Sequence, residues 1–102
     1  MWLAVGNDVS IPSATETEIC QWTADGVRQV VGFFASAVKG GQARYYEGGI
    51  RKITVDIAYS GEEPYLPFIS KPYVPANGTI ISLRFFHENP SAQTVQGAIL
   101  GG

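Results

Sequence analysis

Cys20 is the only cysteine of the chain, and Glu16 and Glu18 precede it at alternate positions. A nucleophilic cysteine needs a thiolate and a neighbouring base, so this cluster has the composition of a catalytic site. Alternate side chains of a β-strand lie on one face, and we therefore expect Glu16, Glu18 and Cys20 to share a face. Negative charges beside the thiol would raise its pKa. The pattern favours an unreactive cysteine, buried as a small hydrophobic residue.

The other residue types that could carry chemistry are too few or wrongly spaced. His87 is the only histidine, and no pair of residues has the spacing of metal ligands. Glu62 and Glu63 are adjacent in a Ser-Gly-Glu-Glu-Pro turn, where they splay apart, whereas a glycosidase needs two carboxyl groups facing each other across a cleft. We expect no catalytic residue, no metal, no cofactor and no enzymatic activity.

The aromatic residues leave a binding function open. Tryptophans and tyrosines along the chain could form a platform on which sugar rings stack. Because Tyr45 and Tyr46 are neighbours in an expected strand, at most one of them points outward. We expect most aromatic residues to serve the core or a subunit interface. A carbohydrate-binding or receptor-binding sandwich that uses outward aromatics such as Tyr46 or Tyr73 is the alternative hypothesis.

Composition and charge exclude several classes of partner. The 102 residues suffice for a single domain, 1–102, with one modest core. The net charge is −2 and the basic residues form no dense stripe, so nucleic acid is not expected to bind. No apolar run approaches the ~20 residues that cross a bilayer, and the first residues lack the features of a signal peptide. Charged residues make up 16% of the chain, below the roughly 25% of an average domain, which leaves uncharged surface for contacts with neighbours.

Apolar and polar residues alternate along most of the chain, as in strands with one buried face. Ile81, Leu83 and Phe85 share one such expected face. No window shows the periodicity of a helix. We predict about eight strands, near residues 2–5, 16–22, 27–38, 42–47, 50–59, 66–70, 79–88 and 94–100.

Turn signals separate these strands. Asp25-Gly26 and Asn77-Gly78 supply residues that tolerate positive φ in tight turns. Prolines between residues 64 and 75 predict an extended, edge-like segment, because proline cannot donate to a sheet. Short strands at regular spacing predict an all-β, antiparallel, jelly-roll-like β-sandwich. The sequence alone does not separate a jelly roll from an immunoglobulin-like topology.

Several segments resemble small jelly-roll virion proteins of tailed bacteriophages. The resemblance starts with Ile11-Pro12 and the run Thr15-Glu16-Thr17-Glu18-Ile19, and continues through the Asp25-Gly26 turn. It extends over the strand VVGFFASA, the segment PANGTIISLRFFHE and the closing GAILG, nearly the whole chain. It implies a capsid decoration (cement) protein, or a module of a head or tail fibre. Such proteins have no catalytic residues to compare.

The resemblance also implies partners and a location. A decoration protein associates with its own copies, as a homotrimer over a capsid symmetry axis or as a bridge between neighbouring capsomers, and binds the major capsid protein. It is made in the host cytoplasm and lies on the capsid surface of the virion. Trp2 could anchor such an interface or cap the domain's own core. The interface residues we expect are Trp2, Leu3, Tyr65, Phe68 and Tyr73.

Overall fold

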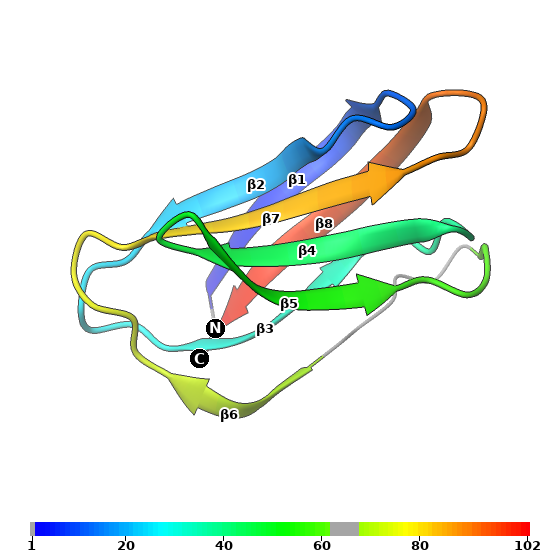
Figure 1. Ribbon diagram of the computed structural model, residues 1–102. Coiled ribbons are helices and arrows are strands. Elements are labelled where there is room, and N and C mark those ends of the chain that lie inside the picture. The colour runs from blue at the N-terminus through cyan, green and yellow to red at the C-terminus, as the bar shows by residue number, and fades with distance from the viewer. Residues whose placement is uncertain (1, 62–67) are drawn as a thin grey trace.

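The computed structural model describes residues 2–61 and 68–102, which form eight β-strands (Figure 1). In chain order they are β1 (Trp2–Ile11), β2 (Thr17–Thr23), β3 (Val30–Ala35), β4 (Gly41–Glu47), β5 (Ile50–Asp56), β6 (Phe68–Tyr73), β7 (Ile80–His87) and β8 (Gln93–Gly101). The predicted all-β fold of about eight strands is confirmed. Within the described ranges, no helix has the length and apolar character to cross a membrane.

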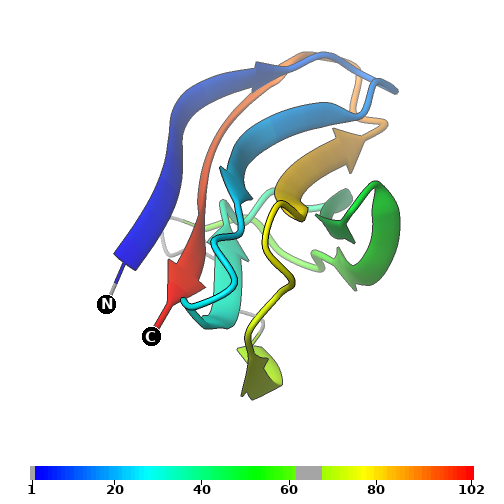
Figure 2. The ribbon, with the colours of Figure 1, turned by 90° about the vertical axis from the view of Figure 1, so that its left-hand side faces the viewer.

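The strands form two antiparallel sheets of four that pack face to face. Sheet A has the order β1-β8-β3-β6, and sheet B has the order β2-β7-β4-β5. The chain therefore changes sheet at nearly every connection, and its first and last strands pair with each other. This order is that of a jelly roll and decides between the two topologies that the sequence left open. The start of β1 and the end of β8 lie side by side at one end of the sandwich (Figure 2).

The core fills the space between the two sheets. Ile81, Leu83 and Phe85 of β7 are all 0% exposed, which confirms that they share the buried face. Phe33 of sheet A stacks on Tyr45 of sheet B with ring centroids 5.3 Å apart. Inward-facing apolar residues of both sheets thus meet across the sandwich, as the alternating pattern requires.

β1 is longer than the predicted strand at residues 2–5. Its register with β8 shifts between Gly6 and Val9, and Asp8 adopts a φ of 52°. This bulge absorbs the polar residues that interrupt the alternation, after which the strand continues to the buried Ile11. The prediction ended early because a bulge resets the pattern on which it depended.

β3 is shorter than the predicted strand at residues 27–38. The Asp25 carboxylate accepts hydrogen bonds from the backbone N–H groups of Val27 and Arg28, both at 2.9 Å. These bonds hold the residues before β3 in a turn, so the strand begins only at Val30.

β6 lies a few residues after its predicted position of 66–70 and forms an edge of sheet A. An edge position is the one expected for a proline-containing strand, and β6 includes Pro72. The other strands end within three residues of their predicted bounds.

Candidate functional site

The outer face of sheet A carries a contiguous apolar surface. Leu3 and Val5 of β1 point outward and are 53% and 50% exposed. Val5 pairs with Ala98 of β8, which pairs on its other side with Phe34 of β3. Two residues along each strand, on the same face, Leu3 pairs with Leu100. We call Leu3, Val5, Phe34, Ala98 and Leu100 the apolar outer face.

Ala98 shows how closely this surface is packed. It lies on the outside of the sheet and is nevertheless 0% exposed. Its cross-strand neighbours Val5 and Phe34 are larger and cover it from both sides. The apolar outer face is therefore a joined patch rather than a set of separate side chains.

Trp2 lies on the opposite face of β1 from this patch. Its indole packs over Gly101, where an added Cβ would overlap the ring, and its centroid is 4.2 Å from that of Trp22. The indole nitrogen is buried without a hydrogen-bond partner among the described residues. Of the two roles considered for Trp2, its position is that of a cap on the domain's own core.

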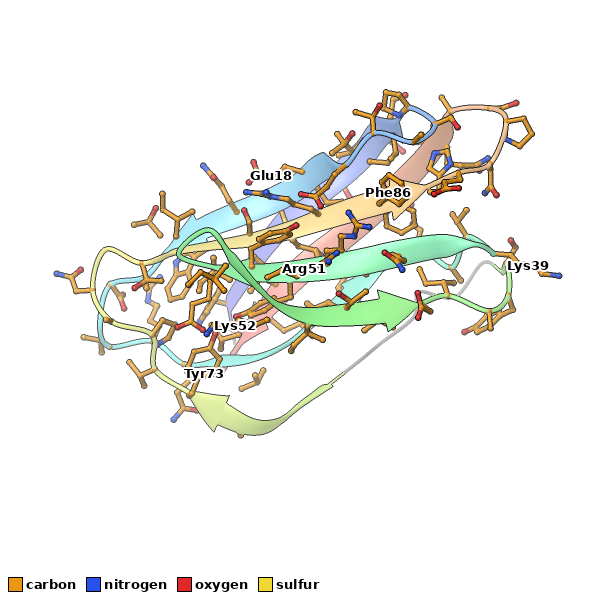
Figure 3. All side chains as sticks on the ribbon, in the orientation of Figure 1. Glu18, Lys39, Arg51, Lys52, Tyr73 and Phe86 are labelled. Atoms are coloured by element: carbon orange, nitrogen blue, oxygen red, sulfur yellow. The ribbon has the colours of Figure 1, made fainter. Side chains whose placement is uncertain are left out.

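The other expected interface residues differ in their exposure, and two of them are not fully described. Leu3 is exposed on the apolar outer face. Tyr73 is half-buried, and its hydroxyl donates to Glu47 Oε2 at 3.1 Å and lies 2.6 Å from the Tyr45 hydroxyl (Figure 3). Tyr65 lies outside the described residues. Phe68 pairs with Gly32 through its backbone, and its side chain is outside the described part.

A charged cluster occupies the outer face of sheet B. The Glu16 carboxylate, just before β2, accepts hydrogen bonds from Arg44 Nη1 at 2.7 Å, Arg84 Nη1 at 3.0 Å and the Tyr46 hydroxyl at 2.7 Å. Arg44 and Arg84 are directly opposite each other on β4 and β7. Glu16 therefore offsets the repulsion between two paired cations.

Aromatic rings support both guanidinium groups of this cluster. The Arg84 guanidinium lies 4.1 Å from the centroid of Tyr46, and that of Arg44 lies 4.4 Å from the centroid of Phe86. Burial of the Glu16 carboxylate opposes its ionisation, but the hydrogen bonds from Arg44, Tyr46 and Arg84 outweigh burial and lower its pKa to about 2. One carboxylate thus bridges two guanidinium groups, which leaves the cluster with a net charge of +1 and its hydrogen-bonding groups largely engaged.

The partners of Glu16 lie far from it in the chain, 28 residues away for Arg44 and 68 for Arg84. No local pattern marks these residues as partners, so the sequence alone did not predict the cluster. The expectation that at most one of Tyr45 and Tyr46 points outward is confirmed, since Tyr45 is 1% exposed and Tyr46 lies in the outer cluster.

A groove of about 600 Å³ lies beside the cluster, between β2, β7 and the turns at one end of sheet B. Ser82 Oγ donates to Glu18 Oε1 at 2.8 Å on its floor. No aromatic side chain lines it within the described part of the chain. The side chains that line it include Glu18, Gln21, Asn77, Ile80, Ser82 and Arg84.

Cys20 faces the core, whereas the preceding glutamates face solvent. The register of β2 with β7 shifts between Glu18 and Cys20, so Glu18 pairs with the outward Arg84 and Cys20 with the buried Leu83. The expectation that Glu16, Glu18 and Cys20 share a face is wrong, because a bulge at Ile19 reverses the alternation. Burial, more than the charge of Glu18, raises the pKa of the Cys20 thiol to about 11. The predicted burial of the cysteine is confirmed.

His87 also serves the interior. Its side chain is fully buried, with Nε2 2.7 Å from the carbonyl oxygen of Ile11 and Nδ1 accepting from the Asn89 N–H at 3.2 Å. Since Nδ1 accepts, the ring proton is on Nε2 and is donated to Ile11. No group of histidine, cysteine and carboxylate side chains that could hold a metal occurs in residues 2–61 and 68–102. Glu62 and Glu63 fall outside these ranges.

Comparisons of the chain with protein-family models, with curated proteins and with solved structures found no match.

Proposed function

We propose that this chain is a structural protein of a tailed-bacteriophage virion, a capsid decoration protein that lies on the outer surface of the shell. In this role it binds the major capsid protein and associates with its own copies. The proposal combines the sequence resemblance with the jelly-roll topology and with the distribution of apolar surface. A jelly roll by itself hosts many functions, so the surface carries more weight than the fold.

The apolar outer face is the observation that carries the proposal. Single exposed apolar residues are ordinary on soluble proteins, whereas contiguous exposed patches mark sites of interaction. Leu3 and Val5 stand about half exposed at one side of this patch, with Phe34 and Leu100 continuing it across three strands. An open sheet surface of this kind suits a broad protein partner better than a small ligand, which needs a concave site.

The potentially reactive side chains support an interaction role for a different reason. Cys20 and His87 are buried, and the Glu16 carboxylate is held by three donors. Each of these groups has a structural task in the described part of the chain. None of them is in the state that nucleophilic or acid–base chemistry would need.

Co-sedimentation with expanded capsid shells of the source phage tests the proposal. We expect the wild-type protein to bind and the Leu3→Lys variant to lose binding, because a charge would be buried in the contact. Ile80→Lys is the matched control, since Ile80 is 48% exposed but lies on sheet B. Wild-type protein that does not sediment with the shells would refute the capsid role.

The groove on sheet B favours one second candidate, a carbohydrate-binding module. Gln21, Asn77 and Glu18 line it with groups that donate to and accept from sugar hydroxyls. Stacking is less available, because Arg84 covers one face of the Tyr46 ring.

Affinity electrophoresis through neutral polysaccharides separates the two candidates. Retardation that is lost in Gln21→Ala, with unchanged thermal unfolding, would favour the glycan role. Equal mobility of the wild-type protein and this variant would reject it.

A further inference from the structure

The four edge strands of the sandwich differ in how they are protected against pairing with another chain. An exposed edge offers unpaired backbone groups, and proteins usually guard it with charges, prolines or bulges. β5 presents the exposed Arg51 and Lys52 (Figure 3), and the sequence of β6 contains Lys71 and Pro72. β2 carries Glu18 and the bulge that follows it. Three of the four edges are therefore guarded.

The first half of β1 has none of these devices. Its residues Trp2–Gly6 read WLAVG, without a charge or a proline, and the β1 bulge begins only after Gly6. β1 pairs with β8 alone, and it lies along the margin of its sheet (Figure 2). Among the described residues, no loop or turn forms a backbone hydrogen bond to this half-strand.

We propose that residues Trp2–Gly6 of β1 pair antiparallel with the same residues of a second copy, across a two-fold axis. Two A sheets then join into one continuous sheet. This contact rests on the proposed function, which includes association of the chain with its own copies. It adds the identity of the partner at the β1 side of the apolar outer face, namely a second copy of the chain.

Self-complementarity is the reason for choosing a second copy as the occupant. A free strand edge is satisfied by another free edge, and an antiparallel two-fold contact uses the same surface on both copies. With the axis at Ala4, Leu3 lies opposite Val5 of the second copy, and Trp2 lies opposite its Gly6. No like charges meet across this axis, and large side chains face small or apolar ones.

The apolar outer face gains continuity from this pairing. The row that runs from Phe34 through Ala98 to Val5 extends onto Leu3 of the second copy. Apolar area that is half exposed in the monomer becomes covered on both sides of the junction. A contact of this symmetry is complete with two copies, so its smallest unit is a dimer that could bridge neighbouring capsomers, whereas the resemblance also allows a trimer.

Analytical ultracentrifugation over a concentration series tests the contact. We expect wild-type protein to dimerise and Val5→Lys to weaken dimerisation at least about 100-fold, because two lysines would enter an uncharged contact. Val5 is half exposed, so the lysine fits the monomer, and circular dichroism checks that the variant folds. Ile80→Lys, with 48% exposure on the other sheet, should dimerise like wild type.

A charge-pair experiment then tests the register. Leu3→Glu and Val5→Lys should each be monomeric alone and should form a heterodimer when mixed, since the new charges lie opposite each other. Failure of the mixture to associate would reject the Ala4-centred register.

The contact itself is overturned if wild-type protein stays monomeric, or if it forms an oligomer that Val5→Lys leaves intact. If wild-type protein binds the shells as a monomer, the dimer contact is overturned and the capsid role is kept. If it dimerises but does not bind the shells, the dimer contact is kept and the capsid role is overturned.

Discussion

Replacing Glu16 by glutamine tests the charged cluster on sheet B most directly. The substitution keeps the size of the side chain and removes the negative charge of the carboxylate, which accepts hydrogen bonds from both Arg44 and Arg84. Hydrogen bonds from these residues and Tyr46 overcome the effect of burial and lower the pKa of Glu16 from 4.5 to about 2. A shift of this size corresponds to ~3 kcal/mol of folding free energy for a shielded group, at about 1.4 kcal/mol per pKa unit.

Solvent reduces this value. The Glu16 side chain is 24% exposed, so screening weakens its ion pairs. We therefore expect Glu16→Gln to lower the free energy of unfolding at pH 7 by about 1–2 kcal/mol.

The dependence on pH has a definite sign. Because the folded-state pKa of Glu16 is lower than its unfolded-state value of 4.5, the stabilisation is complete above pH 4.5. It is lost as the pH falls toward about 2, where the folded protein also takes up the proton. The stability difference between wild type and Glu16→Gln should therefore shrink to a small fraction of its neutral value across this interval.

Urea unfolding followed by tryptophan fluorescence at a series of pH values measures this difference. Glu88→Gln is the matched control, because Glu88 is exposed and has no hydrogen bond or ion pair with another described residue. The control should behave like wild type throughout. A stability difference for Glu16→Gln that is absent at pH 7, or that persists unchanged near pH 2, would refute the assignment of the stabilisation to the ionised carboxylate.

Three further predictions concern the core. Burial raises the pKa of Cys20 to about 11. At pH 8, iodoacetamide should therefore leave the folded protein unmodified, whereas it should label Cys20 fully in protein unfolded by urea. Rapid labelling of the folded protein would contradict the inward orientation of Cys20. Leu83→Ala should lower the free energy of unfolding by about 2–5 kcal/mol in urea titrations, because Leu83 is 0% exposed, whereas Ile50→Ala, at a site 62% exposed, should change it little. Gly6→Ala should cost at least about 2 kcal/mol in the same assay, since its Cβ would lie 2.0 Å from the backbone oxygen of Ile19; a neutral effect would show that β1 and β2 can separate.

Local patterns predicted the elements of this fold well. The alternation in β7 identified a strand and its buried face, and the Asp25-Gly26 and Asn77-Gly78 turns place glycines at φ values of 77° and 87°. These features depend on residues a few positions apart, where backbone sterics and side-chain alternation act directly.

Two of the errors arose at bulges. At Ile19 one extra residue reverses the alternation, so Glu18 faces solvent while Cys20 enters the core. The bulge after Gly6 likewise hid the second half of β1. A bulge depends on the partner strand as much as on its own residues, and a single strand's sequence therefore shows little sign of it.

The sequence by itself determined that this chain forms strands and where most of its turns lie, and it correctly predicted that the cysteine is buried. Only the tertiary structure decided which strands pair, and therefore which residues lie together on the outer faces of the two sheets. The apolar outer face joins β1, β3 and β8, and the Glu16 cluster joins residues up to 68 positions apart. Pairing across such distances depends on the register of the whole sheet, because each strand fixes the neighbours of the next.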